Sequence, residues 1–153
     1  MRWSILLPAL ALFLAADTRD ARACSCLPSG PPCEDYFESD VVFVGTVRSI
    51  TPVPAAHYSA SVRVEFDNIA SSRGVEGTAV TAFTANNAAA CGFAFRRGER
   101  YVVYARRSKE TKQILVSICS RTRPVSEAGE DLKFFDSLST TPITPCGPAG
   151  RQC

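Results

Sequence analysis

The chain has 153 residues, of which 46% are hydrophobic and 21% charged, and its formal net charge is +2. This length is enough for one domain but short for two. The nearly equal numbers of basic and acidic residues give no overall field that would attract nucleic acid or a membrane surface, so neither is expected as a partner.

Residues 1–23 have the features of a secretory signal peptide. A cationic start at Arg2 precedes twelve apolar residues, 5–16, and Ala21 and Ala23 supply an A-x-A cleavage pattern. Twelve residues cover about 18 Å as a helix, too short for a bilayer core of about 30 Å, and no later segment is apolar enough to span one. We therefore expect a mature chain that begins at Cys24 and is secreted, extracellular or periplasmic. An uncleaved anchor or a core helix is the alternative.

All seven cysteines follow the expected cleavage site: Cys24, Cys26, Cys33, Cys91, Cys119, Cys146 and Cys153. In an exported chain this pattern predicts a disulfide framework. Six cysteines allow 15 pairings, so their number alone does not decide the connectivity. A metal site built on Cys24 and Cys26 is the weaker alternative, because no second close pair exists and His57 is the only histidine.

A proline-rich arm, residues 27–33, precedes a stretch of β-rich segments. Residues 33–38 allow one helical turn. Alternating and β-branched patterns predict strands at residues 41–50, 61–67, 78–84, 101–106 and 114–118. Five short strands with frequent turn signals are typical of a small sandwich or barrel. Gly45, within the first of them, predicts a bulge or a sharp bend.

The end of the chain changes to a helical period. Residues 125–138 place Leu132, Phe135 and Leu138 on one face, with Ser126 as the predicted N-cap. We expect this amphipathic helix to pack on the sheet.

Little in the chain suggests catalysis. A nucleophile–base pair could use only His57, and no P-loop, dinucleotide-binding or H-E-x-x-H motif is present. The adjacent carboxylates Glu34/Asp35 and Glu130/Asp131 are expected to be solvated. The chain is therefore expected to be a binding or inhibitory protein without a resident cofactor, and not an enzyme.

Three segments together resemble the netrin-like (NTR) domain, and in particular the N-terminal domain of the tissue inhibitors of metalloproteinases (TIMPs). They are Cys24-Ser25-Cys26-Leu27-Pro28 at the cleavage site, the pattern C-G-x-x-F-x-x-G-x-x-Y over residues 91–101, and Cys119-Ser120-Arg121. The resemblance covers nearly the whole mature chain. It implies a mostly β fold: a five-stranded OB-fold barrel with a short N-terminal helical turn and a C-terminal helix packed on it. The domain would span residues 24–146, followed by a short tail, 147–153.

The resemblance also implies three disulfides: Cys24–Cys91, Cys26–Cys119 and Cys33–Cys146. Cys153 is then left over, and it could be free, link two chains into a dimer, or replace Cys146 as the partner of Cys33. Apart from such a dimer, a monomer is expected.

By the same resemblance, the partner is a zinc metalloprotease. The α-amino group and carbonyl oxygen of Cys24 would chelate the target's zinc, in trans only, and displace its catalytic water. Ser25 would enter the S1′ pocket, and Leu27 and Pro28, after Cys26, would lie along the cleft. Ala88, Ala89 and Ala90 would form a second edge of the contact surface.

Two alternatives remain open at this stage. The wider netrin-like family includes domains that inhibit nothing and bind other extracellular proteins. A lipid anchor on Cys24 is a further alternative, but it would block the amine, and Arg22 fits its processing pattern badly. By this resemblance the given residues correspond to the N-terminal domain of the animal inhibitors, with a longer segment between Cys33 and the first strand.

Overall fold

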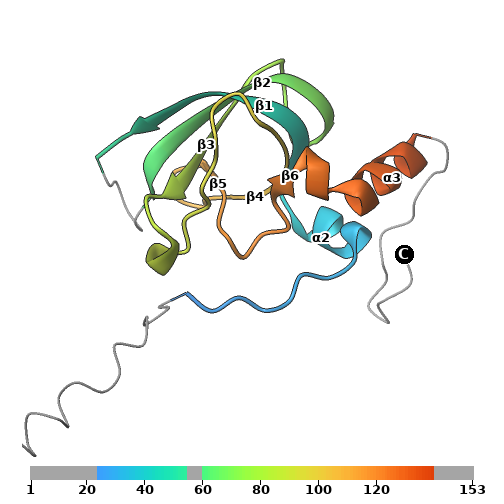
Figure 1. Cartoon of the computed structure of the whole chain (residues 1–153), viewed down its shortest axis with the longest axis horizontal. Coiled ribbons are helices and arrows are strands. Elements are labelled where there is room, and N and C mark those ends of the chain that lie inside the picture. The colour runs from blue at the N-terminus through green and yellow to red at the C-terminus, as the bar shows by residue number, and fades with distance from the viewer. Residues whose placement is uncertain (1–23, 55–59, 140–153) are drawn as a thin grey trace, which may run out of the picture.

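The computed structural model describes residues 24–54 and 60–139. Six strands and two α-helices make up the described part (Figure 1), together with two short 3₁₀ turns. The strands are β1 (Val41–Pro52), β2 (Ala60–Arg73), β3 (Val80–Ala85), β4 (Arg100–Arg107), β5 (Ile114–Leu115) and β6 (Arg123–Pro124). The helices are α2 (Pro32–Glu38) and α3 (Gly129–Leu138), and the 3₁₀ turns are η1 (Ala88–Ala90) and η2 (Val125–Glu127). The mostly β architecture expected from the sequence is confirmed.

Five strands pair in a closed ring. Neighbours follow the order β1-β2-β3-β5-β4, and β4 also pairs with β1. Strand β6 pairs with the first half of β4, at Tyr101 and Val102. Every pairing is antiparallel except the short parallel contact between β3 and β5. The predicted fifth strand is shorter than expected, because after Leu115 the chain leaves the ladder toward Cys119. Val116 N still donates to Phe83 O, and Ile118 N donates to Cys91 O.

Two hydrophobic clusters explain why residues 41–45 of β1 and 101–105 of β4 are buried without interruption. Phe43, Phe66 and Val103 belong to the cluster enclosed by the ring, whereas Val102 and Tyr104 belong to a second cluster beneath α3. Successive residues of a strand point to opposite faces, so a strand buried on both faces cannot alternate with polar residues. Burial of each large side chain contributes roughly 1.5–3 kcal/mol.

The irregularity expected at Gly45 is present. The register of β1 against β2 shifts between Val44 and Thr46, which pair with Ala70 and Asp67. A Cβ atom at Gly45 would lie 2.7 Å from Ile69 Cδ1 and 3.1 Å from the Phe43 ring, so a larger residue at this irregularity would require these side chains to shift.

The C-terminal helix begins later than predicted, and the N-cap assigned to Ser126 is wrong. Ser126 lies in the 3₁₀ turn η2, and Ala128 is the N-cap residue of α3. Ala128 is fully buried in the second cluster, and Pro124 is paired with β4. Tertiary contacts therefore fix the start of the helix. Its predicted apolar face does pack on the sheet through Leu132, Phe135 and Leu138.

The N-terminal arm passes along one end of the ring before it enters α2, which lies beside α3 (Figure 1). No helix among residues 24–54 and 60–139 is long and apolar enough to cross a membrane. The predicted signal peptide, His57, Cys146, Cys153 and the tail lie outside the described residues.

Candidate functional site

Two disulfides hold the N-terminal arm, which comprises residues 24–31 before α2, against the ring. Cys24 is bonded to Cys91, after η1, and Cys26 is bonded to Cys119, after β5. These are the first two pairings that the resemblance implies. Cys33, in α2, is buried and disulfide-bonded, but the predicted partner Cys146 lies outside the described residues.

Between and after these two bonds, the arm presents its side chains to solvent. Ser25, Leu27, Pro28 and Ser29 are all exposed. Leu27 is 89% exposed, although burial of a leucine side chain is normally favourable by roughly 1.5–3 kcal/mol. A single exposed leucine is ordinary on a protein surface, so Leu27 matters for binding only together with other exposed apolar residues near it.

The alanines Ala88–Ala90 form η1, and all three are exposed. The side chain of Asn87 caps this turn by accepting a hydrogen bond from Ala90 N at 2.9 Å, and Cys91 ends it in the left-handed conformation, with φ of 60°. Gly92 N donates to Asn87 O, and a Cβ at Gly92 would overlap the carbonyl oxygens of Ala85 and Asn87. Position 92 therefore has a steric reason to be glycine.

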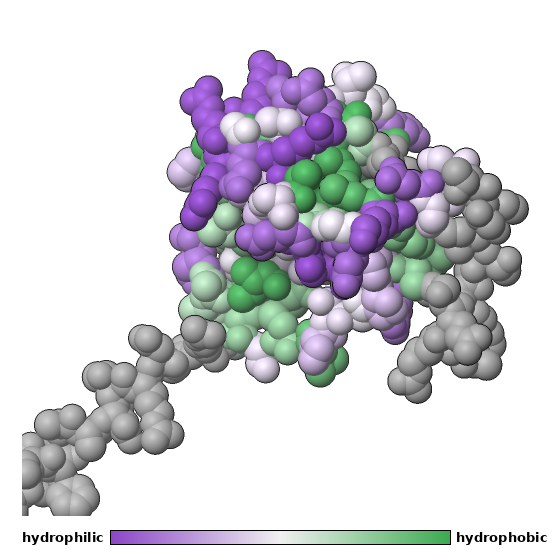
Figure 2. All heavy atoms as spheres, turned by 45° about the vertical axis from the view of Figure 1, so that its right-hand side comes forward, coloured by the Kyte–Doolittle hydropathy of each residue, from purple (hydrophilic) through white to green (hydrophobic). Residues whose placement is uncertain are grey.

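Ile118 is a surface residue that the sequence did not single out, because it was assigned to a predicted strand. Its side chain is 39% exposed, and its N–H donates to Cys91 O at 3.0 Å. The signal that could have found it is its position directly before Cys119. We call the exposed residues of this region the N-terminal ridge; they are Ser25, Leu27, Pro28, Ala88, Ala89, Ala90 and Ile118. Hydrophobic surface is visible near the start of the described chain in Figure 2.

The sulfur atoms of the two disulfides are close together. The Sγ atoms of Cys24, Cys26 and Cys119 lie within 4.8 Å of one another. All three belong to disulfides, so none is the thiolate that a metal ion would require. In this oxidised state the arm is a cross-linked element and not a metal site.

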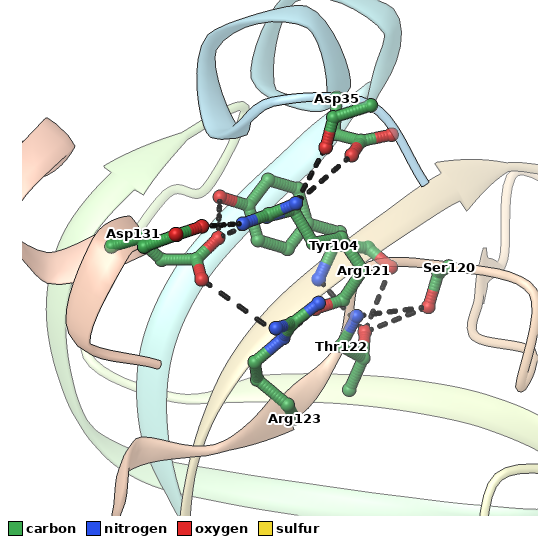
Figure 3. A network of polar contacts seen from close by, with 9 residues as sticks. Asp35, Tyr104, Ser120, Arg121, Thr122, Arg123 and Asp131 are labelled. Carbon is green, nitrogen blue, oxygen red and sulfur yellow. Dashed lines mark hydrogen bonds and ion pairs between the residues drawn. The ribbon is translucent and has the colours of Figure 1, made fainter. Parts of the chain in front are cut away.

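Arg121, two residues after Cys119, connects the arm to both helices (Figure 3). Its side chain is 5% exposed, and its guanidinium donates to Asp131 Oδ1 at 2.6 Å and to the carbonyl oxygen of Gly30 in the arm. It also lies 3.1 Å from a carboxylate oxygen of Glu130 and 3.8 Å from one of Asp35, in α2. The arm is thus fixed at Gly30 as well as at the two disulfides.

Asp131 is at the centre of this network, and its expected solvation is wrong: its side chain is 1% exposed. The carboxylate accepts a hydrogen bond from Tyr104 Oη at 2.6 Å as well as from Arg121. Glu130, its neighbour, is 79% exposed, as expected. The adjacent pair was misjudged because sequence adjacency on a helix does not tell which member faces the sheet.

The network changes the acidity of its members. Burial, together with the hydrogen bond to Asp131, raises the pKa of Tyr104. Burial also raises the pKa of Asp35, and the positive charge of Arg121 only partly opposes this effect. Burial would lower the pKa of Arg121, but the hydrogen bond and charge of Asp131 outweigh it, so that this pKa is raised and Arg121 stays charged. The network therefore favours a neutral Tyr104 phenol beside a charged Arg121 guanidinium.

Comparison of the chain with protein-family models and with curated proteins finds no match. The likeness to the netrin-like family therefore stays a prediction from the sequence motifs.

Proposed function

We propose that the chain is a secreted TIMP-like inhibitor of zinc metalloproteases that acts through a free N-terminus at Cys24. The observation that carries this proposal is the N-terminal ridge: an exposed segment, cross-linked at Cys24 and Cys26 and flanked by the exposed turn η1. The exported location belongs to the same proposal. It is supported by the disulfides and by the signal-like sequence of residues 1–23.

The strand arrangement supports the proposed OB-type barrel. Five strands, β1 to β5, close on one another, and connections between non-neighbouring strands are needed to reach the order β1-β2-β3-β5-β4. A five-stranded Greek-key barrel has this character. Helix α3 covers the outer face of β1 and β4, as the resemblance implies for the C-terminal helix.

Cleavage before Cys24 would create the chelating group. The α-amino nitrogen and the carbonyl oxygen of Cys24 can occupy the open position of a catalytic zinc, provided that the amine is neutral. An α-amino pKa of about 7.7–8.0 makes the neutral form readily accessible near neutral pH. The zinc belongs to the target, and Cys24 contributes no thiolate because its sulfur is bonded to Cys91.

The remaining ridge residues would supply affinity and selectivity. Ser25 would occupy the S1′ pocket, Leu27 and Pro28 would lie along the cleft, and Ala88–Ala90 would contact the opposite wall. Because two disulfides and the Arg121–Gly30 hydrogen bond fix the arm beforehand, docking would cost little ordering entropy. The small alanines allow the two edges to enter a narrow cleft together.

The test is inhibition of a panel of zinc metalloproteases by protein purified after export, with its N-terminus established by intact mass. A variant with one alanine added before Cys24 should lose inhibition, because the amine is displaced from the zinc. Ser25→Gly should weaken it strongly while the unfolding midpoint stays unchanged. Equal inhibition by all three proteins would refute the chelating mechanism.

One observation favours a second candidate, a non-inhibitory netrin-like module that binds another extracellular protein. The exposed side chains of Leu27 and Ile118 offer an apolar contact surface that needs no free amine. This candidate predicts that binding survives the added alanine and is lost in Leu27→Asp. The two variants therefore separate the candidates.

A further inference from the structure

The two disulfides of the arm are close enough for a thiolate released from one to attack the other. Cys24 Sγ lies 3.7 Å from Cys119 Sγ, although the two atoms belong to different disulfides. Cys26 Sγ lies within 4.8 Å of both. Thiol–disulfide exchange requires a thiolate to reach a disulfide sulfur, and the 3.7 Å between Cys24 Sγ and Cys119 Sγ is close to contact between sulfur atoms.

Access from solvent differs between the two bonds. Cys26 and Cys119 are exposed, whereas Cys24 and Cys91 are half-buried. A small thiol in solution therefore meets the Cys26–Cys119 bond first. The Cys24–Cys91 bond lies behind it, next to Cys119 Sγ.

We propose that these four cysteines form a disulfide-exchange centre, in which a low-molecular-mass thiol such as glutathione interconverts two pairings of the arm. The thiolate of glutathione attacks Cys26 Sγ, forms a mixed disulfide there and releases Cys119 as a thiolate. Cys119 then attacks Cys24 Sγ, which forms Cys24–Cys119 and releases the Cys91 thiolate.

The last step closes the cycle. The Cys91 thiolate attacks Cys26 in the mixed disulfide, forms Cys26–Cys91 and releases glutathione as its thiolate. Two protein disulfides are present before and after the sequence, so no net oxidant or reductant is consumed. The thiol acts as a catalyst.

Exchange would rebuild the N-terminal ridge. Two residues of extended chain cover about 7 Å, so swapping the attachment points of Cys24 and Cys26 displaces the start of the arm by a comparable distance. Residues further along remain held by the hydrogen bond from Arg121 to Gly30. The thiol concentration outside the protein therefore sets how fast the two shapes of the arm interconvert, while their relative stability sets the proportions, and this holds whether or not the arm inhibits a protease.

The sharpest test uses Cys26→Ser, because only one arm cysteine then remains and its partner is unambiguous. This variant leaves the Cys119 thiol beside the Cys24–Cys91 bond. The species with a Cys24–Cys91 bond is isolated at pH 4, where thiolate is scarce, and then moved to higher pH without added thiol. Samples are alkylated and their linked peptides are mapped by mass spectrometry.

We expect a Cys24–Cys119 bond and alkylated Cys91 to appear at a rate independent of protein concentration. The rate should rise about tenfold per pH unit below a thiol pKa of about 8.5. Cys91→Ser provides the matched variant, since its free Cys24 thiol should convert Cys26–Cys119 into the same Cys24–Cys119 bond. The proposal would be overturned if, in Cys26→Ser, Cys119 stayed alkylated while Cys91 stayed bonded to Cys24. It would also be overturned if exchange occurred only after denaturant was added.

The wild-type chain gives an independent measurement if either variant folds poorly. Oxidised protein is incubated with a trace of reduced glutathione, and fragment ions of the arm peptide locate the partners of Cys24 and Cys26. The exchanged pairing should accumulate with no net loss of disulfides. Simple reduction of Cys26–Cys119, with Cys24–Cys91 intact, would refute exchange.

Discussion

Arg121 and Asp131 form an ion pair whose side chains are 5% and 1% exposed. Burying both charges costs desolvation energy, which offsets much of their attraction. The main effect of the pair is therefore to fix the positions of the groups that hydrogen-bond to it. Here the positions that it fixes are the Gly30 carbonyl in the arm, the Tyr104 hydroxyl in β4 and the start of α3. The residue pair is therefore a positioning element for the N-terminal ridge.

Asp131→Asn should lower the free energy of unfolding by roughly 3 kcal/mol, because it leaves the Arg121 charge buried without its nearest partner. We take the low end of the usual range, since Asp35 and Glu130 still face Arg121. Denaturant unfolding measures the change. Glu130→Gln is the matched control, and its effect should stay below about 1 kcal/mol because Glu130 is largely exposed. Equal losses of unfolding free energy in the two variants would contradict the conclusion that Asp131 is the main partner of Arg121.

Tyr101 makes a separate prediction about pH. Burial and the hydrogen bond that its hydroxyl donates to Glu99 raise its pKa from 10.0 to about 12. The folded state thus keeps the phenol proton at pH values where the unfolded state has lost it. The contribution of Tyr101 to the free energy of unfolding is therefore intact below pH 10 and is lost as the pH rises toward 12.

Ultraviolet titration of the wild type and Tyr101→Phe should differ by one phenolate that forms near pH 12. The variant should also lose less stability between pH 10 and pH 12, although its stability at neutral pH is lower because two hydrogen bonds are missing. If the spectral difference between the two proteins developed near pH 10, the pKa of Tyr101 would not be raised in the folded state.

At the scale of elements, the turn η1 is set by its flanking residues and not by its alanines. Asn87 caps it, Cys91 ends it in the left-handed region, and Gly92 lets the chain pass against the end of β3. Helix α3 follows the same rule, because buried Ala128 and Asp131 decide where it begins. Both elements are short, so tertiary contacts outweigh helix propensity.

Gly92→Ala should destabilise the protein by about 1–3 kcal/mol or more, because the new methyl group overlaps two backbone carbonyl oxygens that cannot move independently. Gly129→Ala is the control: a Cβ there meets nothing within 4 Å, so the change should be neutral or stabilising. Thermal unfolding of both variants measures the contrast. A similar midpoint for Gly92→Ala and the wild type would mean that the loop shifts freely.

At the scale of the whole molecule, the described chain is a ring of strands with cores on both sides of β1 and β4. The strand positions followed from alternation in β2 and from the apolar runs of β1 and β4, because burial on one face or on both leaves a direct pattern in the sequence. The pairing of β4 with β1, which closes the ring, and the parallel contact of β3 with β5 have no such pattern in the sequence. Both join segments that are far apart in the chain.

The sequence by itself determined the mostly β class, the irregularity at Gly45 and the apolar face of α3, because each depends on local residue chemistry. Through the motif it also indicated the partners of Cys24 and Cys26. Only the tertiary structure decided that Asp131 is buried while Glu130 is not, that Ile118 joins the ridge, and that Cys24 and Cys119 bring their sulfurs to 3.7 Å. The physical reason is the same in each case: these properties arise from segments that meet across the fold, and no local pattern records which segments will meet.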